Sequence, residues 1–194
     1  MKEKPYQGYT LGSRGSRFFS ALINAILLGI VINIITQATG TSVNPMDAFD
    51  FNKLQEIQEI AKDPKNVLIN AAIAAIVHAL YGYLCYPNLR GTIGHKALKL
   101  RVVNADKTTL NASQGAKREL LKVVPSILSD LGVIVGAGLQ TIIVLGALIY
   151  FIWLLWDEDK QNLYDKIAKT YVVLDTDPVI PQENTQNNPT SDTI

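Results

Sequence analysis

The residues of this chain that could do chemistry are polar and ionisable side chains within apolar stretches. Lys122, Ser126 and Asp130 recur at every fourth position, which places them on one face of a helix. A charged aspartate in hydrocarbon costs about 2.5–3.5 kcal/mol on insertion scales, so such residues commonly face a cavity or a partner. This spacing predicts a polar pathway leading inward from one membrane edge. The alternative is a short or interfacial helix that leaves Asp130 hydrated.

Two further polar residues interrupt apolar stretches. His78 lies on a stripe of small residues that lets another helix approach closely, so we expect it to face protein. Its imidazole is then either a hydrogen-bonded packing residue or a proton relay, because its ordinary pKa is near neutrality. Asn24 follows Arg17 by two helical turns and is expected to form a hydrogen bond with a neighbouring helix or to contribute to a polar pathway.

The composition argues against several other kinds of site. The single cysteine rules out an internal disulfide, and with only two histidines we expect no metal site and no cofactor. A net charge of +1 lacks the clustered basic excess that nucleic-acid binding requires. The sequence shows no nucleophile beside a base, no phosphate-binding glycine loop and no catalytic pair of carboxylates. We therefore expect neither an enzyme nor a nucleic-acid partner.

The elements that must position these residues are apolar helices. About 20 residues cross the hydrocarbon of a bilayer, and the apolar runs predict spans at 18–36 and 67–86. A signal peptide is the alternative for the first run. The apolar run 120–156 predicts two short crossings, 120–137 and 139–156, because a glycine cluster between them permits a reversal. A single span after an interfacial helix is the alternative there.

The distribution of charge predicts the orientation. Basic residues gather before the first span and between 87 and 118, whereas the connector 37–66 holds five acidic residues against three lysines. The positive-inside rule therefore predicts a multi-pass protein of the cell membrane, with the N-terminal segment 1–16 and the C-terminus in the cytoplasm. The basic face would also attract anionic lipid headgroups, by about 1 kcal/mol per residue. The alternative is that these charges only fix the topology.

Three smaller elements complete the expected fold. Apolar residues at helical spacing between 44 and 64, including Pro45 at the start, predict an amphipathic helix on the outer leaflet or, alternatively, a partner-binding helix. The β-branched runs 98–103 and 169–175 predict two strands that pair with each other. Residues 175–194 are predicted to be disordered. The expected fold is an all-α membrane protein: a bundle of about four transmembrane helices, an outer amphipathic helix and a short cytoplasmic two-stranded element.

Separated motifs resemble those of the RDD family of integral membrane proteins. The stretches are RFFSALIN at the first span, RGTIGHKALKLRVVN, AKRELL before the third apolar region, and QNLYDKIAKTYVV near the C-terminus. The residues at the family's motif positions are Arg17, Asn24, Thr92, Gly94, Arg101, Arg118, Asp165 and Thr170. The resemblance covers most of 14–173 and implies a membrane domain at 17–174 and, more weakly, transport.

The chain departs from the family pattern in ways that bear on function. Asn24 replaces an aspartate, His95 stands where a lysine is usual, and Lys99 and Lys169 occupy places often held by glycine. Because Asn24 cannot titrate, its presence argues against proton or cation carriage through that position. Asp165 lies just outside the last span, and we expect it to pair with Arg17 or Arg118 as a structural latch.

Two functions fit these features. The first is a small transport protein for ions or solutes that uses Asp130, His78 and Asn24 after oligomerisation. The second is a non-catalytic membrane accessory protein that binds lipid or another protein through its basic face and outer helix. The expected partners are the lipid bilayer, anionic headgroups, and a second copy or another membrane protein.

Overall fold

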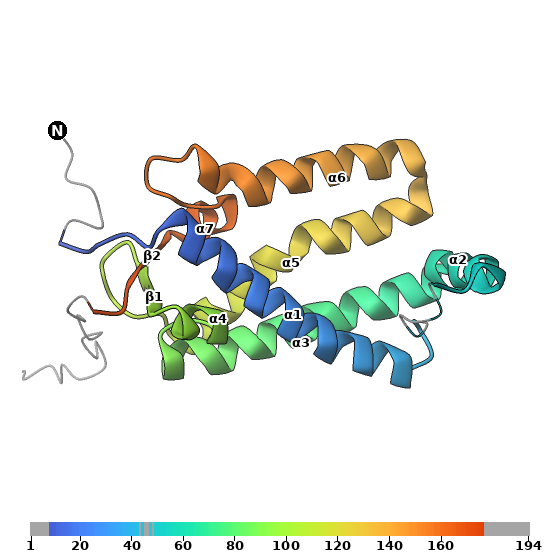
Figure 1. Cartoon of the computed structure of the whole chain (residues 1–194), viewed down its shortest axis with the longest axis horizontal. Coiled ribbons are helices and arrows are strands. Elements are labelled where there is room, and N and C mark those ends of the chain that lie inside the picture. Colours follow the sequence, from blue (N-terminus) through green and yellow to red (C-terminus); the bar gives the residue numbers. More distant parts are fainter. Residues whose placement is uncertain (1–7, 43, 45–46, 48, 177–194) are drawn as a thin grey trace, which may run out of the picture.

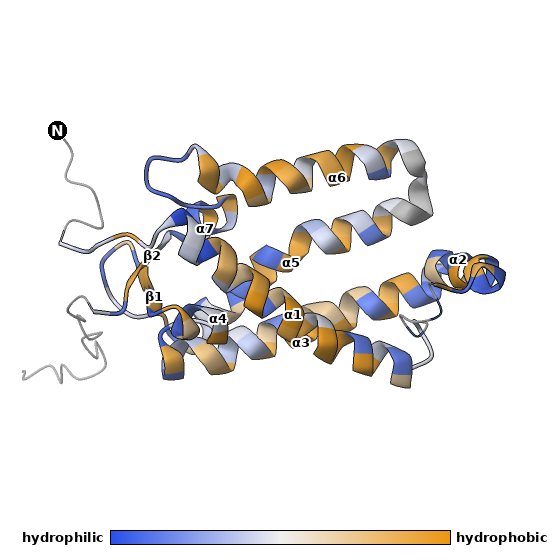
Figure 2. Cartoon of the chain, in the orientation of Figure 1, coloured by the Kyte–Doolittle hydropathy of each residue, from blue (hydrophilic) through white to orange (hydrophobic). Residues whose placement is uncertain are grey.

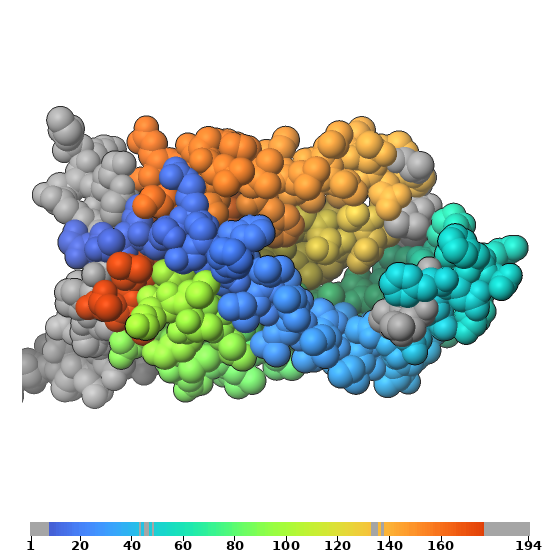
Figure 3. Space-filling model, viewed as in Figure 1, coloured from blue at the N-terminus to red at the C-terminus, as the bar shows by residue number. Residues whose placement is uncertain are grey.

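Four long helices run side by side along the molecule. The computed structural model describes residues 8–42, 44, 47 and 49–176. Figure 1 shows α6, α5 and α3 next to one another, with α1 crossing in front, and Figure 3 shows α1 lying across the surface of the others. The helices are α1 (Arg14–Ala38), α3 (Pro64–Leu89), α5 (Ala112–Val135) and α6 (Ala137–Ile152).

Short elements gather at the two ends of these helices. The sheet end carries both described chain ends and the elements α4 (Ile93–Ala97), β1 (Leu100–Asn104), η3 (Trp153–Leu155), α7 (Leu163–Ala168) and β2 (Thr170–Leu174). The opposite end, called here the α2 end, carries η2 (Phe51–Lys53) and α2 (Leu54–Lys62). The helices therefore separate two chemically different ends.

Three helical stretches of the described residues are long and apolar enough to cross a membrane. They are Arg14–Ala38, Pro64–Ala97 and Gly138–Leu155, and Figure 2 shows the many hydrophobic residues along their ribbons. The predicted number of about four spans is not confirmed. The helix α5 lies beside α3 and α6, but five charged residues interrupt its sequence: Lys117, Arg118, Glu119, Lys122 and Asp130.

Particular residues explain where α5 begins and where the chain reverses after it. Asn111 and Gln114 form a capping box at the start of α5, eight residues before the predicted span at 120. The chain reverses at Gly136, whose φ of 137° is a backbone conformation that favours glycine. The reversal thus falls within the predicted glycine cluster, one or two residues before the predicted boundary.

The predicted two-stranded element is present. The strands β1 and β2 are antiparallel, with Val102 opposite Val172 at the centre, and the sheet packs on Tyr86 and Leu110. Leu11 forms a further bridge with Val173, and residues 10–12 therefore extend the sheet edge. The helix α1 begins at Arg14, before the predicted boundary at 17.

The sheet is built from two copies of one local unit, at 92–104 and 162–174. In each unit the side chain of the third helical residue accepts a hydrogen bond from the backbone N–H of the N-cap residue. His95 Nδ1 accepts from Thr92 at 3.2 Å, and Asp165 Oδ2 accepts from Asn162 at 3.1 Å. A lysine with positive φ then leads into a five-residue strand. Because Val102 and Val172 hold equivalent places and face each other, the units are related by a local two-fold axis.

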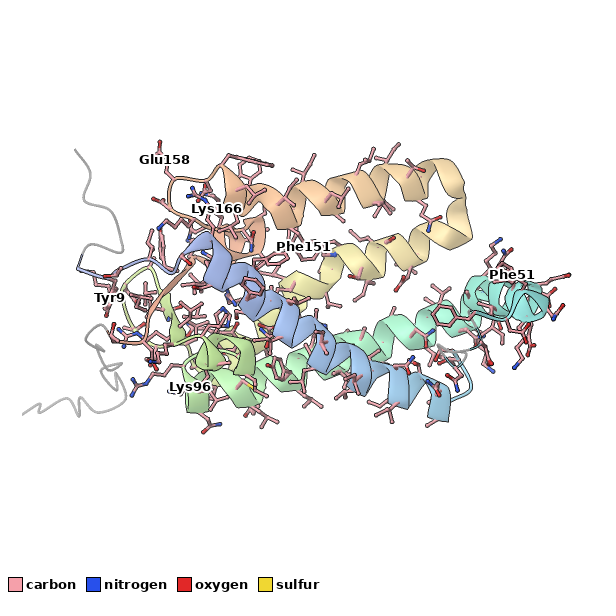
Figure 4. The ribbon with its side chains drawn as sticks, in the orientation of Figure 1. Tyr9, Phe51, Lys96, Phe151, Glu158 and Lys166 are labelled. Atoms are coloured by element: carbon pink, nitrogen blue, oxygen red, sulfur yellow. The ribbon has the colours of Figure 1, made fainter. Side chains whose placement is uncertain are left out.

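The predicted amphipathic helix corresponds to η2 and α2 and is shorter than expected. Pro45 and Met46 lie outside the described residues. Phe49 and Phe51 are 79% and 87% exposed, and Figure 4 shows Phe51 projecting from the α2 end. The predicted disordered tail also lies outside the described residues, except for Asp175 and Thr176. The backbone N–H of Asp175 donates to the Lys99 carbonyl at 2.9 Å.

Candidate functional site

Asp165 joins two arginines from distant parts of the chain. Its Oδ2 accepts a hydrogen bond from Nη2 of Arg17 at the start of α1, and its Oδ1 accepts one from Nη2 of Arg118 in α5. All three side chains are buried, those of Asp165 and Arg118 completely. Because Asp165 also caps α7 through the Asn162 N–H, one carboxylate ties α1, α5 and α7 together at the sheet end.

The charge state of Asp165 follows from these partners. Burial alone would raise the pKa of its carboxyl, but the guanidinium groups of Arg118 and Arg17 outweigh burial and hold this pKa below its usual range. The carboxylate is therefore ionised at neutral pH. Arg118 makes a further hydrogen bond of 3.1 Å from Nε to Thr170 Oγ1, which fixes the start of β2 in the same network.

Tyr86 connects this pair to a second carboxylate. Its hydroxyl accepts a hydrogen bond from Arg118 and donates one to Glu119 Oε1 at 2.7 Å. Glu119 is 1% exposed and pairs with Lys122, and His78 Nδ1 lies 3.8 Å from Glu119 Oε2. These five charged residues form what we call the ion cluster: Arg17, Arg118, Glu119, Lys122 and Asp165.

Asn24 attaches α4 to α1. Its Oδ1 accepts hydrogen bonds from the Gly94 N–H at 3.0 Å and the Tyr81 hydroxyl at 2.8 Å, and its Nδ2 donates to Thr92 Oγ1 at 2.7 Å. A Cβ on Gly94 would lie 2.9 Å from Asn24 Nδ2 and collide with the α1 backbone. The amide therefore has three partners in a close packing contact, and glycine is required opposite it.

Arg101 complements these contacts from β1. Its side chain is completely buried, and its guanidinium carbon lies 5.2 Å from the centroid of the Tyr9 ring. This cation–π contact holds the segment before α1 against the sheet. Every residue at a predicted family-motif position thus lies at or next to the sheet end.

The predicted polar pathway is divided by the structure. His78 and Lys122 both contact Glu119. Asp130 lies about 12 Å further along α5 than Lys122 and lines a cavity at the α2 end, while Ser126 is exposed between them. His78, Lys122, Ser126 and Asp130 therefore do not form one continuous site.

The sequence prediction missed Glu119 and Tyr86. Glu119 follows Arg118 directly and precedes Lys122 by three residues, a helical ion-pair spacing that was available as a signal. Tyr86 looked like an interfacial aromatic, and its hydroxyl position depends on the packing of α3 on α5. In the described part of the chain, no group of three or more His, Cys, Asp or Glu residues could hold a metal ion.

One comparison with known proteins finds a match. The model of the RDD family matches residues 11–169, a range that includes the ion cluster and ends one residue before β2. No curated protein and no solved structure matches the chain.

Proposed function

Because the chain belongs to the RDD family, we propose that it is a non-catalytic integral membrane protein whose sheet end binds the phosphate headgroups of anionic lipids. Three helices long and apolar enough to cross a bilayer support this proposal, in which the sheet end would lie at one headgroup layer. By the positive-inside rule this layer belongs to the cytoplasmic leaflet.

The observation that carries this proposal is a set of basic residues in an unfavourable backbone conformation. Every described non-glycine residue with positive φ is Lys or Arg, and all of them belong to the sheet end: Arg90, Lys99, Lys107, Lys160 and Lys169. A side chain in this conformation costs about 1 kcal/mol relative to glycine. Their side chains must therefore supply something that glycine lacks, and a positive charge is what they share.

The contacts within the chain do not use all of this charge. Asp175 lies 3.8 Å from Arg90 and 3.1 Å from Lys96. Lys99, Lys107 and Lys169 have no ion pair with any described residue. A basic residue at an anionic membrane surface gains about 1 kcal/mol, which is similar to its backbone cost. Figure 4 shows Lys96 and Lys166 at this same end.

The ion cluster supports a structural role beneath this surface. Its carboxylates each contact at least two cationic side chains or hydroxyl donors, so the buried charges hold helices together instead of facing a substrate. Short side-chain contacts from α1, α5 and α7 meet at Asp165. The cluster therefore keeps the basic loops in a fixed arrangement at the membrane surface.

Thermal unfolding in two lipid environments tests the proposal. The melting temperature of the purified chain is measured in neutral detergent micelles doped with phosphatidylglycerol or with phosphatidylcholine. We expect a higher melting temperature with phosphatidylglycerol than with phosphatidylcholine. This difference should be smaller for the double variant Lys99→Gly/Lys169→Gly, in which the positive φ angles suit the residue but both positive charges are absent. Lys62→Gln, which removes a charge at the α2 end, is the control. An unchanged lipid difference in the double variant would contradict the proposal.

Ion transport is the second candidate function, favoured by the contact of His78 and Lys122 with Glu119 between α3 and α5. Three ionisable side chains in one helix interface could exchange a proton. Cation-dependent proton flux is measured in liposomes holding the wild type, His78→Ala or Asp130→Asn. Flux that both variants abolish supports transport, and absence of flux under sodium, potassium and lithium gradients rejects it.

A further inference from the structure

A cavity of about 220 Å³ at the α2 end is lined in part by Asp130, which is also exposed at the surface. Its walls come from the loop after α1 and from α2, α3 and α5. This cavity lies at the opposite end of the helices from the basic loops, so it has no part in the lipid binding proposed above.

The polar wall opposite Asp130 is held in place by its own hydrogen bonds. Thr41 Oγ1 donates to Asn70 Oδ1 at 2.6 Å, and Asn70 Nδ2 donates to the Thr41 carbonyl at 3.1 Å. Thr41 is also only 4% exposed. These two side chains already have partners within the protein, and they join the end of α1 to α3. They form a fixed wall whose hydrogen-bonding groups are largely occupied.

Asp130 has a different situation. Its side chain forms no hydrogen bond or ion pair with any described residue, and none of the described residues that line the cavity is Lys or Arg. The rest of the wall near it is aliphatic and comes from Ile57, Ile60 and Val67. A carboxylate beside apolar surface, without a cation from the protein, is suited to a ligand that carries both a positive charge and an alkyl group.

We infer that this cavity binds a small alkylammonium ion, with Asp130 as its counter-ion and the aliphatic wall around its alkyl group. The volume is below the range of about 300–1,000 Å³ usual for drug-sized ligands, which limits the ligand to a few carbon atoms. A divalent metal ion is a poorer fit, because calcium takes six to eight oxygen ligands and the cavity has a single carboxylate. The acidic excess of the connector 37–66 favours the approach of cations.

Methyl NMR of the full chain in detergent micelles tests the inference directly. Isobutylammonium chloride is titrated into protein labelled at the isoleucine δ1 methyl groups, and the signals of Ile57 and Ile60 are assigned by Ile→Val variants. We expect both signals to shift and saturate in the wild type. Isobutanol, which has the same alkyl group without the charge, and sodium chloride at equal concentration should leave these signals in place.

Variants separate the charge from the shape of the site. Asp130→Asn should raise the dissociation constant by about tenfold or more, and Ala61→Leu should do the same by filling the cavity while keeping the carboxylate. Glu56→Gln is the control, because Glu56 is an acidic residue of α2 that does not line the cavity. This variant should bind isobutylammonium as tightly as the wild type. The inference is overturned if the wild type shows no saturable shift, if Asp130→Asn binds equally well, or if Glu56→Gln weakens binding as much.

Discussion

Asp165→Asn is expected to remove a large part of the folding free energy while leaving the shape of the side chain intact. The asparagine can still accept the Asn162 N–H that caps α7. It loses the negative charge, and its NH₂ group must face one of the two arginines that now contact carboxylate oxygens. Both guanidinium groups would then be buried beside a neutral amide.

The magnitude follows from burial. Asp165 and Arg118 are 0% exposed and the Arg17 side chain is 3% exposed, so water cannot replace the lost charge. Breaking a buried pair by removing one partner costs about 3–5 kcal/mol, which compares with about 5–15 kcal/mol for the whole stability of a typical domain. Asp175→Asn is the matched control. It removes a charge whose partners Arg90 and Lys96 are 49% and 55% exposed, and such pairs contribute about 0–1 kcal/mol.

The assay is reversible unfolding by SDS in mixed micelles, followed by circular dichroism at several pH values. Because the pKa of folded Asp165 is lowered, its stabilisation is present above the usual carboxyl pKa of about 3.9 and is lost as pH falls through the folded value. The difference between wild type and Asp165→Asn should therefore be constant from about pH 6 to 8 and shrink below about pH 4. A loss no larger than that of Asp175→Asn would refute the reasoning.

Two further predictions concern close packing. A Cβ on Gly115 would lie 2.7 Å from Tyr86 Cβ, whereas nothing lies within 4 Å of one on Gly146. Gly115→Val should therefore cost at least about 1–3 kcal/mol, whereas Gly146→Ala should cost nothing, because alanine favours a helix over glycine by about 1 kcal/mol. Equal effects of the two variants on SDS unfolding would contradict this. Asn24 and His95 both contact Thr92, so Asn24→Asp/His95→Lys should be less destabilised than the sum of the single variants by at least about 1 kcal/mol. Additive effects would show that these two departures from the family pattern are independent.

Local sequence was a good guide where a single property decides the structure. The β-branched runs predicted both strands within two residues of β1 and β2, because few other conformations suit such residues. Asp165 was expected to pair with Arg17 or Arg118. The structure brings both arginines to it, because the first turns of α1 and α5 both contact α7, which the sequence does not reveal.

Hydropathy was a weaker guide to α5. It marks lipid-facing residues, whereas the first turns of α5 carry buried charges of the ion cluster. The capping residues Asn111 and Gln114 were the better sequence signal for its start. Helical periodicity grouped Lys122 with Asp130 on one face of a helix. Their contacts differ because they lie at different positions along α5, and these contacts depend on how α5 packs.

The local two-fold unit was visible in the sequence and was missed. The pattern Lys-x-x-Lys-x-x-Val-Val begins at Lys96 and again at Lys166. An eight-residue pattern of lysines and valines is too short to identify a repeat by itself. The capping residues could not support it, because they differ between the two units. A self-comparison that scored local backbone roles would have found it.

The most direct test of the central claim is the lipid that the protein retains from a membrane. The chain is extracted from bilayers of equal parts phosphatidylglycerol and phosphatidylethanolamine, and bound lipids are counted by native mass spectrometry. The account predicts that the wild type and Lys62→Gln retain mainly phosphatidylglycerol, while Lys99→Gly/Lys169→Gly retains less of it. Equal retention of the two lipids by the wild type, or no loss in the double variant, would contradict the claim that the strained lysines bind anionic headgroups.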